Sequence, residues 1–241
     1  MFKHAVFNPQ NNNAYFCANI IKQVAYKAII IGATGLIGST LLDILLKEPE
    51  YTEVFVLVRK EIAIKHKKLT QIVVDFDKLD DYADVITGHA IFCCLGTTRK
   101  NTPDKNTYRK IDHDYPVKIA QIGAQNGVEQ FHIVTALGAD PNSSIAYPKL
   151  KGETEEDVKK SGIKNIFIYQ PSMITGDRKE NRPLEKVITV IMRAIDPLLI
   201  GRLKKYRSIP AKTIASAMFK QSLTNNEGIF VYPSDKIKQI A

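Results

Sequence analysis

The sequence of 241 residues predicts an α/β fold in which helices cover both faces of a doubly wound parallel sheet. Short apolar runs, such as KAIII, VFVLV and FHIVT, alternate along the chain with longer segments of helical period. These runs are apolar throughout instead of alternating with polar residues, which is typical of parallel strands buried on both faces. A glycine-rich turn follows the first run and leads into a helical segment, as in a β/α unit.

The apolar runs and the segments of helical period give the order of the elements. The strands are expected at 27–31, 54–59, 71–75, 90–95, 129–135 and 164–169. The helices are expected at 36–48, 104–126, 147–161, 184–198 and 210–223. A short strand near 229–232 and a last helical turn at 234–240 complete the fold.

The first residues differ from the rest of the chain. Residues 1–26 contain a polar asparagine run and show neither a strand nor a helix period, so they are expected to form a poorly ordered extension. The absence of repeats and proline-rich linkers predicts one domain at 27–241, with 171–241 forming a small C-terminal lobe.

The composition is that of a folded protein, with 44% hydrophobic and 24% charged residues. Thirty-four Lys and Arg against 25 Asp and Glu give a net charge of +9, which favours an anionic ligand. The basic residues are spread along the chain without interleaved aromatic residues, so no nucleic acid partner is expected. A phosphate-bearing small molecule fits this charge better.

Cysteine and histidine spacing argue against disulfides and metals. Cys17, Cys93 and Cys94 cannot form a disulfide framework, which suits a reducing compartment and predicts a cytoplasmic protein. The five histidines lack the spacing of metal ligands, so no metal is expected. The longest hydropathic stretch, 28–46, contains Asp43 and three glycines, so a strand, a turn and a helix explain it better than a membrane span.

The segment IIIGATGLIG carries the most informative motif. Gly32, Gly35 and Gly38 lie between an apolar strand and a helix, the spacing of a dinucleotide-binding turn. The first glycine permits the tight turn, the second lets the backbone approach a pyrophosphate, and the third lets the helix pack closely. The sequence therefore predicts a Rossmann-type fold that binds a dinucleotide.

The ends of the next strands indicate which dinucleotide is bound. Arg59 and Lys60 end the second strand, where a basic residue would hold the 2′-phosphate of NADP instead of the free ribose of NAD. Two solvated surface charges are the alternative. Asp75 and Phe76 follow the third strand and are candidates for contact with the adenine, although a polar end to the strand explains them nearly as well.

The fourth strand and the helix after the fifth strand complete the predicted site. Gly96 and Thr97 follow the fourth strand, where a small residue leaves room for a nucleotide. Tyr147 and Lys151 lie four residues apart, so on a helix they share a face. There the ammonium is expected to lower the pKa of the phenol from about 10, making Tyr147 a proton donor or acceptor for a carbonyl or an alcohol.

From about Lys27 to the C-terminus, the chain resembles an atypical short-chain dehydrogenase/reductase and is similar to the Tat-interacting-protein-like oxidoreductases. The resemblance rests on the segments GATGLIG, FCCLGTTR, TALGAD, YPKLKGE, PSMITGDRKENRPLE and KYRSIPAKTIASAM. It implies a Rossmann fold, NADPH as cofactor and Tyr147 as the proton donor. It also implies further cofactor contacts by Thr34, Gly35, Leu36, Ile37, Arg59, Lys60, Leu95, Gly96, Lys151, Ile174 and Arg182.

Two positions depart from this family. Thr135 and Ala136 stand where relatives usually have a pair of serines. If Thr135 is the equivalent position, it is the candidate for the hydroxyl that orients a substrate carbonyl, whereas if Ala136 is, that hydrogen bond is missing. Ser143 and Ser144 are the alternatives. Gln170 stands where the family generally has arginine.

The sequence favours an NADPH-binding oxidoreductase that reduces a carbonyl of a small substrate. One alternative is an NADPH-binding regulatory or sensing protein with little turnover. A second is a sugar-nucleotide epimerase or dehydratase, although 171–241 is short for a lobe that wraps a nucleotide sugar. The apolar segment 187–201 is compatible with a dimer face or a membrane contact, but its Arg193 and Asp196 favour an ordinary core helix, and a homodimer or a protein partner stays open.

Overall fold

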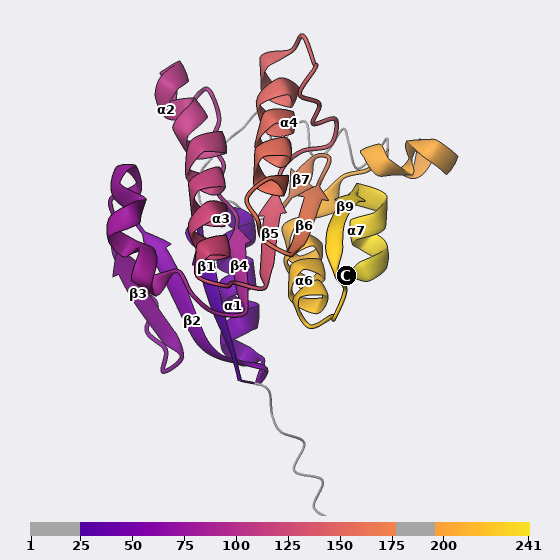
Figure 1. Ribbon diagram of the computed structural model, residues 1–241. Helices are drawn as coiled ribbons and strands as arrows, with labels where there is room; N and C mark the ends of the chain where they lie inside the picture. Colours follow the sequence, from indigo (N-terminus) through magenta and orange to yellow (C-terminus); the bar gives the residue numbers. More distant parts are fainter. Residues whose placement is uncertain (1–24, 177–195) are drawn as a thin grey trace, which may run out of the picture.

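The computed structural model describes residues 25–176 and 196–241, which are arranged around one large sheet (Figure 1). Its seven strands are parallel and lie in the order β3-β2-β1-β4-β5-β6-β9. They are β1 (Tyr26–Ile31), β2 (Tyr51–Val58), β3 (Leu69–Val73), β4 (Ala90–Cys93), β5 (Gln130–Val134), β6 (Asn165–Gln170) and β9 (Gly228–Pro233). The strand order reverses between β1 and β4, which confirms the predicted doubly wound α/β fold.

Helices cover both faces of this sheet. One face carries α1 (Leu36–Lys47), α6 (Ala211–Ser222) and α7 (Ser234–Ile240). The other face carries α3 (Tyr115–Gln125), α4 (Ala146–Lys159) and a 3-10 segment, Phe76–Val85. Successive residues of β1 alternate between these layers, with Ala28 and Ile30 in the first core and Ile29 and Ile31 in the second.

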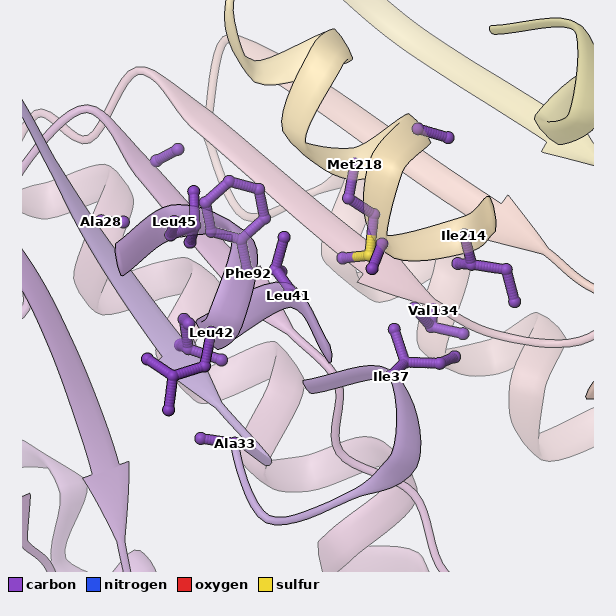
Figure 2. Close-up of a cluster of buried hydrophobic side chains, with 14 of the residues drawn as sticks. Ala28, Ala33, Ile37, Leu41, Leu42, Leu45, Phe92, Val134, Ile214 and Met218 are labelled. Carbon is purple, nitrogen blue, oxygen red and sulfur yellow. The ribbon is translucent and has the colours of Figure 1, made fainter. Parts of the chain in front are cut away.

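The first core lies between the sheet, α1 and α6 (Figure 2). Leu41, Leu42 and Leu45 of α1 are completely buried, and they pack in the same cluster as Ile214 and Met218 of α6. The spacing of these leucines places them on one face of the helix. Burial of each such side chain contributes about 1.5–3 kcal/mol to the stability of the fold. This core therefore holds α1 against the sheet, directly after the glycine turn that precedes the helix.

The helix predicted at 104–126 is present but irregular. It consists of α2 (Lys105–Arg109), a π-helical turn at Lys110–Asp114, and α3. The backbone stays in the right-handed helical region at both junctions, so the three pieces follow one another without a break in the helical backbone. The period of the sequence could not reveal the π turn, because the wider turn is stabilised by contacts with α4 described below.

Several boundaries differ from the prediction. Tyr26 belongs to β1 and stacks on His89 with ring centroids 3.8 Å apart, so it is not part of the N-terminal extension. The strand predicted at 54–59 begins at Tyr51, a buried residue whose hydroxyl donates to Ser222. The strand predicted at 71–75 lies two residues earlier.

Other differences concern short elements. The parallel pair β7 (Ile174–Thr175) and β8 (Ile209–Pro210) was not predicted, because two-residue strands leave no periodic signal. Residues 1–24 of the predicted extension at 1–26 and residues 184–195 of the predicted helix at 184–198 lie outside the described residues. The last three residues of that predicted helix, Asp196–Leu198, form a 3-10 turn. Within the two described ranges, no helix is long and apolar enough to cross a membrane.

Gly38 provides a test of the close packing between β1 and α1. A Cβ atom at this position would lie 2.2 Å from the carbonyl oxygen of Gly32. We therefore expect Gly38→Ala to lower the free energy of unfolding by about 1–3 kcal/mol, despite the higher helix propensity of alanine. Urea unfolding followed by circular dichroism measures the change. Ser39→Ala, one residue along the same helix, is the control and should have little effect; equal stability of both variants would contradict this packing.

Candidate functional site

The turn between β1 and α1 leaves its backbone open to a ligand. Gly32 has φ +83°, and a Cβ atom there would lie 2.6 Å from the carbonyl oxygen of Cys94 at the end of β4. Gly35 caps α1 without a side-chain hydrogen bond, and the first turn of the helix carries no acidic residue. The first N–H groups of a helix have no partner within it and attract negative charge. The turn therefore fits a phosphate-bearing ligand.

A cleft of about 920 Å³ lies beside this turn, at the carboxyl ends of β1, β2, β3 and β4. Its position is the crevice where the strand order reverses, the usual ligand site of open α/β sheets. Ten of the residues predicted from the sequence line it: Gly32, Thr34, Gly35, Arg59, Lys60, Asp75, Phe76, Leu95, Gly96 and Thr97.

Two basic residues stand at the edge of the cleft. Arg59 and Lys60 follow β2 and are exposed. Among the described residues, neither has a carboxylate within 4 Å. Both cations are thus available to an anionic group of a ligand.

Two aromatic side chains form another part of the lining of the cleft. Phe76 and Tyr115 lie with their ring centroids 5.4 Å apart, and both line the cleft. The hydroxyl of Tyr115 donates to Asp77 at 2.8 Å, which fixes the ring. The carboxylate of Asp75 accepts a hydrogen bond from the N–H of Asp77 at 3.0 Å, so one of its oxygens caps the 3-10 segment. Flat apolar walls of this kind suit an adenine ring.

A buried ion pair connects the cleft to α4. The ammonium of Lys151 lies 2.5 Å from Oδ1 of Asp112, and the two side chains are 7% and 1% exposed. Oδ2 of Asp112 accepts from the N–H of Thr97 at 3.0 Å. One carboxylate therefore joins the loop after β4, the π turn and the helix that carries Tyr147.

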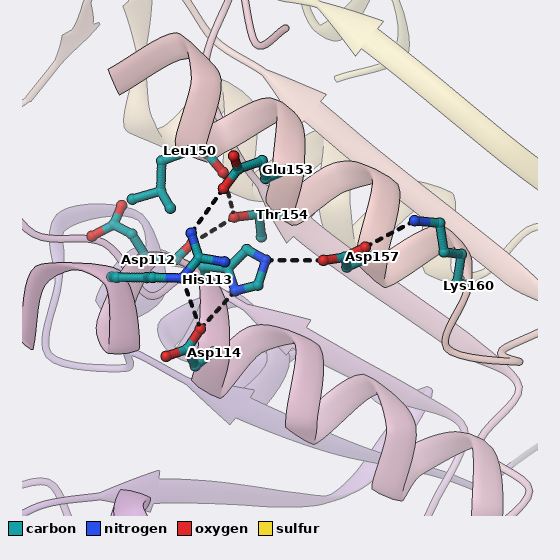
Figure 3. Close-up of polar contacts among 9 residues, drawn as sticks. Asp112, His113, Asp114, Leu150, Glu153, Thr154, Asp157 and Lys160 are labelled. Atoms are coloured by element: carbon teal, nitrogen blue, oxygen red, sulfur yellow. Dashed lines mark hydrogen bonds and ion pairs between the residues drawn. The ribbon is translucent and has the colours of Figure 1, made fainter. Parts of the chain in front are cut away.

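The π turn is held on α4 by further polar contacts (Figure 3). The imidazole of His113 lies between Asp114, at 2.7 Å, and Asp157, at 3.1 Å. The hydroxyl of Thr154 lies 3.0 Å from the carbonyl oxygen of Asp112, a backbone group of the turn. These contacts orient Asp112 toward Lys151.

Tyr147 is 45% exposed at the start of α4. The partial burial of its phenol raises its pKa above the ordinary value, the charge of Asp112 adds to this rise, and Lys151 opposes it. The net direction is opposite to the expectation from the sequence, because the effect of burial on the phenol exceeds the opposing effect of the Lys151 charge. A phenol with a raised pKa stays protonated at neutral pH, so the hydroxyl of Tyr147 has a proton to offer to a ligand.

Thr135, predicted to orient a substrate carbonyl, has a different partner in this structure. Its hydroxyl donates to Oε1 of Glu155 at 2.6 Å. The amide of Gln170 donates to both oxygens of Glu155, at 3.0 and 2.9 Å. Burial raises the pKa of this carboxyl group. Ser143, the alternative, accepts from the N–H of Ile145 and has its own hydroxyl proton free for another acceptor.

The remaining predicted residues lie away from the lining of the cleft. Leu36, Ile37 and Gly38 form the first turn of α1, and Ile174 pairs with Ile209 in the small sheet. Arg182 lies outside the described residues. Six further residues lie at the site but were not predicted, because their spacing in the sequence forms no recognisable motif. They are Asp77, Asn101, Thr102, Thr107, Asp112 and Tyr115.

The fold and the cleft define a Rossmann-type protein whose site fits a nicotinamide dinucleotide. Residues 32–221 match a family model described as NAD(P)H-binding, so the chain belongs to that NAD(P)H-binding family. It is 34% identical over 204 residues to Protein HTATIP2 of Rattus norvegicus, covering 83% of this chain and 82% of the relative. It is also 32% identical over 216 residues to the mitochondrial Protein fmp52-1 of Aspergillus oryzae, with 86% and 91% covered. These findings confirm the resemblance to the Tat-interacting-protein-like oxidoreductases.

Solved structures show the same fold. A UDP-N-acetylglucosamine 4-epimerase from Methanobrevibacter ruminantium superposes with a TM-score of 0.64 at 16% identity, over 87% of this chain and 76% of the epimerase. The enzyme WbmH of Bordetella bronchiseptica, in complex with NAD⁺, superposes with a TM-score of 0.65 at 16% identity, over 89% and 78%. At this level of identity the likeness establishes the fold alone.

Asp112 allows a test of the buried ion pair. Asp112→Asn keeps the shape of the side chain but leaves the buried ammonium of Lys151 without a carboxylate. We expect the free energy of unfolding to fall by about 3–5 kcal/mol, as when one partner of a buried pair is removed. Urea unfolding measures this change, and the double variant Asp112→Asn, Lys151→Met should regain part of the loss.

The matched control breaks an exposed pair. Asp80 lies 2.7 Å from Lys118, and its side chain is 74% exposed, so Asp80→Asn should change stability little. Equal effects of the two asparagine variants would contradict the role of Asp112.

Proposed function

We propose that the protein is an NADPH-dependent oxidoreductase that reduces a carbonyl group of a small substrate. The observation that carries the proposal is the ion pair between Asp112 and Lys151, which connects the dinucleotide cleft to the helix of Tyr147. The NAD(P)H-binding family match supports the cofactor class. We further propose that residues 27–241 act as one domain.

The preference for NADPH rests on Arg59 and Lys60. Both follow β2 at the edge of the cleft, where the ribose of the adenosine half is expected. A 2′-phosphate placed there could pair with both cations. Neither cation would first have to leave a carboxylate of the described residues. The fold relative WbmH contains NAD⁺, so the choice between the two cofactors depends on these two residues of this chain.

The catalytic proposal assigns one role to each side chain. A bound nicotinamide would supply hydride to the carbonyl carbon. Tyr147 would donate its phenolic proton to the carbonyl oxygen, and its raised pKa keeps that proton available at neutral pH. Lys151, fixed by Asp112, would hold the ribose next to the nicotinamide and stabilise the phenolate formed by proton transfer.

An NADPH-binding regulatory or sensing protein is the second candidate. It is favoured by the hydrogen bond from Thr135 to Glu155, because that hydroxyl proton is then not directed at a substrate. In the reductase, Thr135 would exchange this partner for the carbonyl, or Ser143 or Ser144 would take its place. A sugar-nucleotide epimerase or dehydratase is less well supported, because the epimerase that shares the fold is longer and its likeness is limited to fold.

The cytoplasm remains our proposal for the location, on the basis of the cysteine content. The name of the Aspergillus relative includes the word mitochondrial, and a targeting experiment in cells would decide between the two compartments. A homodimer or a protein partner is compatible with this proposal.

The cofactor preference is tested with Arg59→Ala. We expect the wild type to bind NADPH more tightly than NADH, and the variant to lose about tenfold or more of its NADPH affinity, because a hydrogen-bonded pair with the 2′-phosphate is removed. NADH affinity should stay unchanged. Calorimetry on both cofactors measures the difference, with Lys65→Ala, an exposed lysine away from the cleft, as the control. Equal affinities of the wild type for both cofactors would rule out the assignment.

The mechanism is tested with Tyr147→Phe. Loss of the proton donor should reduce turnover by roughly 10² to 10⁴, while NADPH affinity changes little, because the glycine turn and Lys151 remain. NADPH oxidation across a panel of carbonyl compounds measures turnover. Tyr232→Phe, which removes a hydroxyl bound to Gln221 far from the cleft in β9, is the control.

Two outcomes would contradict the reductase. One is a wild-type rate in Tyr147→Phe. The other is a wild type that binds NADPH tightly but is inert across a broad carbonyl panel, and this would favour the sensing role.

A further inference from the structure

A second, smaller pocket lies between the loop after β4, α2 and the start of α4. Its volume is about 280 Å³, near the lower end of the range for small-molecule sites. Figure 3 shows Leu150 and Glu153, two of its residues, on the side of α4 that faces the π turn. The lining comprises Arg99, Thr102, Pro103, Lys105, Tyr108, Arg109, Ala146, Lys149, Leu150 and Glu153.

The pocket combines buried apolar side chains with an exposed basic rim. Tyr108 and Leu150 are 8% and 9% exposed, so they provide its inner wall. Arg99, Lys105 and Lys149 are exposed and surround it. This combination suits a ligand with an apolar or aromatic part and a charged group at one end.

The rim is positive, since four basic residues line the pocket with one carboxylate. Glu153 is already bound by Arg109, at 2.8 Å. Arg99, Lys105 and Lys149 have no carboxylate within 4 Å in the part of the chain that the structure describes. Three cations converging without counter-ions attract an anionic group.

The pocket is next to the proposed catalytic site. Ala146, Lys149 and Leu150 occupy the stripe of α4 adjacent to Tyr147. Thr102 lines both this pocket and the cofactor cleft. Burial is the main cause that raises the pKa of Tyr108 to about 12, and the smaller contributions of Asp112 and Tyr147 to this value show that both lie near the Tyr108 phenol. A ligand in the pocket would thus reach toward the phenol of Tyr147.

We infer that this pocket binds the carboxylate or phosphate group of the substrate, with an apolar part of the same molecule against Tyr108 and Leu150. Arg99 and Lys149 would pair with the anion, and the carbonyl of the substrate would lie toward Tyr147. That the ligand is the substrate rests on the proposed function. The anion site itself rests on the pocket and its unpaired cations.

The test uses small aromatic probes on the full chain. Amide ¹H–¹⁵N spectra are recorded first with saturating NADPH, then during titration with phenyl phosphate, benzoate or benzyl alcohol at constant ionic strength. We expect saturable shifts at Thr102, Tyr108 and Leu150 with at least one of the two anions, and none there with neutral benzyl alcohol. The anion that binds more tightly, phenyl phosphate or benzoate, shows whether the pocket prefers a phosphate or a carboxylate group.

Charge-removing variants supply the second arm. Arg99→Gln and Lys149→Gln should each weaken the binding of the anionic probe by about tenfold, as expected when one hydrogen bond to a charged group is lost. Both residues are exposed, so the fold should be retained. Lys47→Gln, an exposed lysine at the end of α1, should bind the probe as the wild type does.

The outcomes separate this inference from the proposed function. Absence of saturable shifts at the pocket, equal binding of benzyl alcohol, or unchanged affinity in both variants would overturn the anion site. Failure of NADPH to shift the amides of Gly35 and Gly96 would instead overturn the proposed cofactor function. If a carbonyl substrate is found, Arg99→Gln should raise KM for anionic members of the panel and leave neutral members unchanged.

Discussion

The buried pair of Asp112 and Lys151 is the contact on which the site depends. Through Asp112, the loop after β4 is bonded to the π turn, and through Lys151 the π turn is bonded to α4. Both charges are almost completely removed from water, so each requires the other. The sheet and its helices fix the cleft at the ends of β1–β4, but this pair sets the position of the Tyr147 helix relative to that cleft.

The same pair also affects the protonation of Tyr147. Burial of the phenol is the main reason that its pKa is raised, the charge of Asp112 adds to this rise, and the charge of Lys151 opposes it. The phenol is therefore protonated at neutral pH, which agrees with the role of proton donor in the proposed reduction. Tyr147 and Lys151 are four residues apart on α4, so in that proposal the ammonium would stabilise the phenolate left after the proton has moved to the carbonyl oxygen.

The parts of the structure that sequence could predict have local signals. The glycine spacing after β1, the apolar runs and the residues that follow the strands each lie within a short segment, and they predicted the fold and most of the ten residues of the cleft. Thr34 and Leu95 came from the family resemblance alone. The position of Asp112 could not be predicted, because it depends on a π turn held by α4, a helix far along the chain. His113 of the turn contacts Asp157 of that helix, and Thr154 of the helix donates to the carbonyl oxygen of Asp112. The partner of Thr135 was missed for the same reason, since Glu155 is buried beside it only after α4 packs on the sheet.

The distribution of charge around the two pockets agrees with the proposed reaction. Arg59 and Lys60 stand beside the cofactor cleft, and Arg99, Lys105 and Lys149 stand around the smaller pocket, while the pair of Asp112 and Lys151 between them is neutral. Positive potential at both pockets would favour the binding of a phosphorylated cofactor and of an anionic carbonyl compound side by side. These cations are exposed, so their attraction extends about one Debye length into solution and weakens as salt is added. The two groups of cations are thus the part of the basic surface that both negatively charged molecules of the proposed reaction would meet.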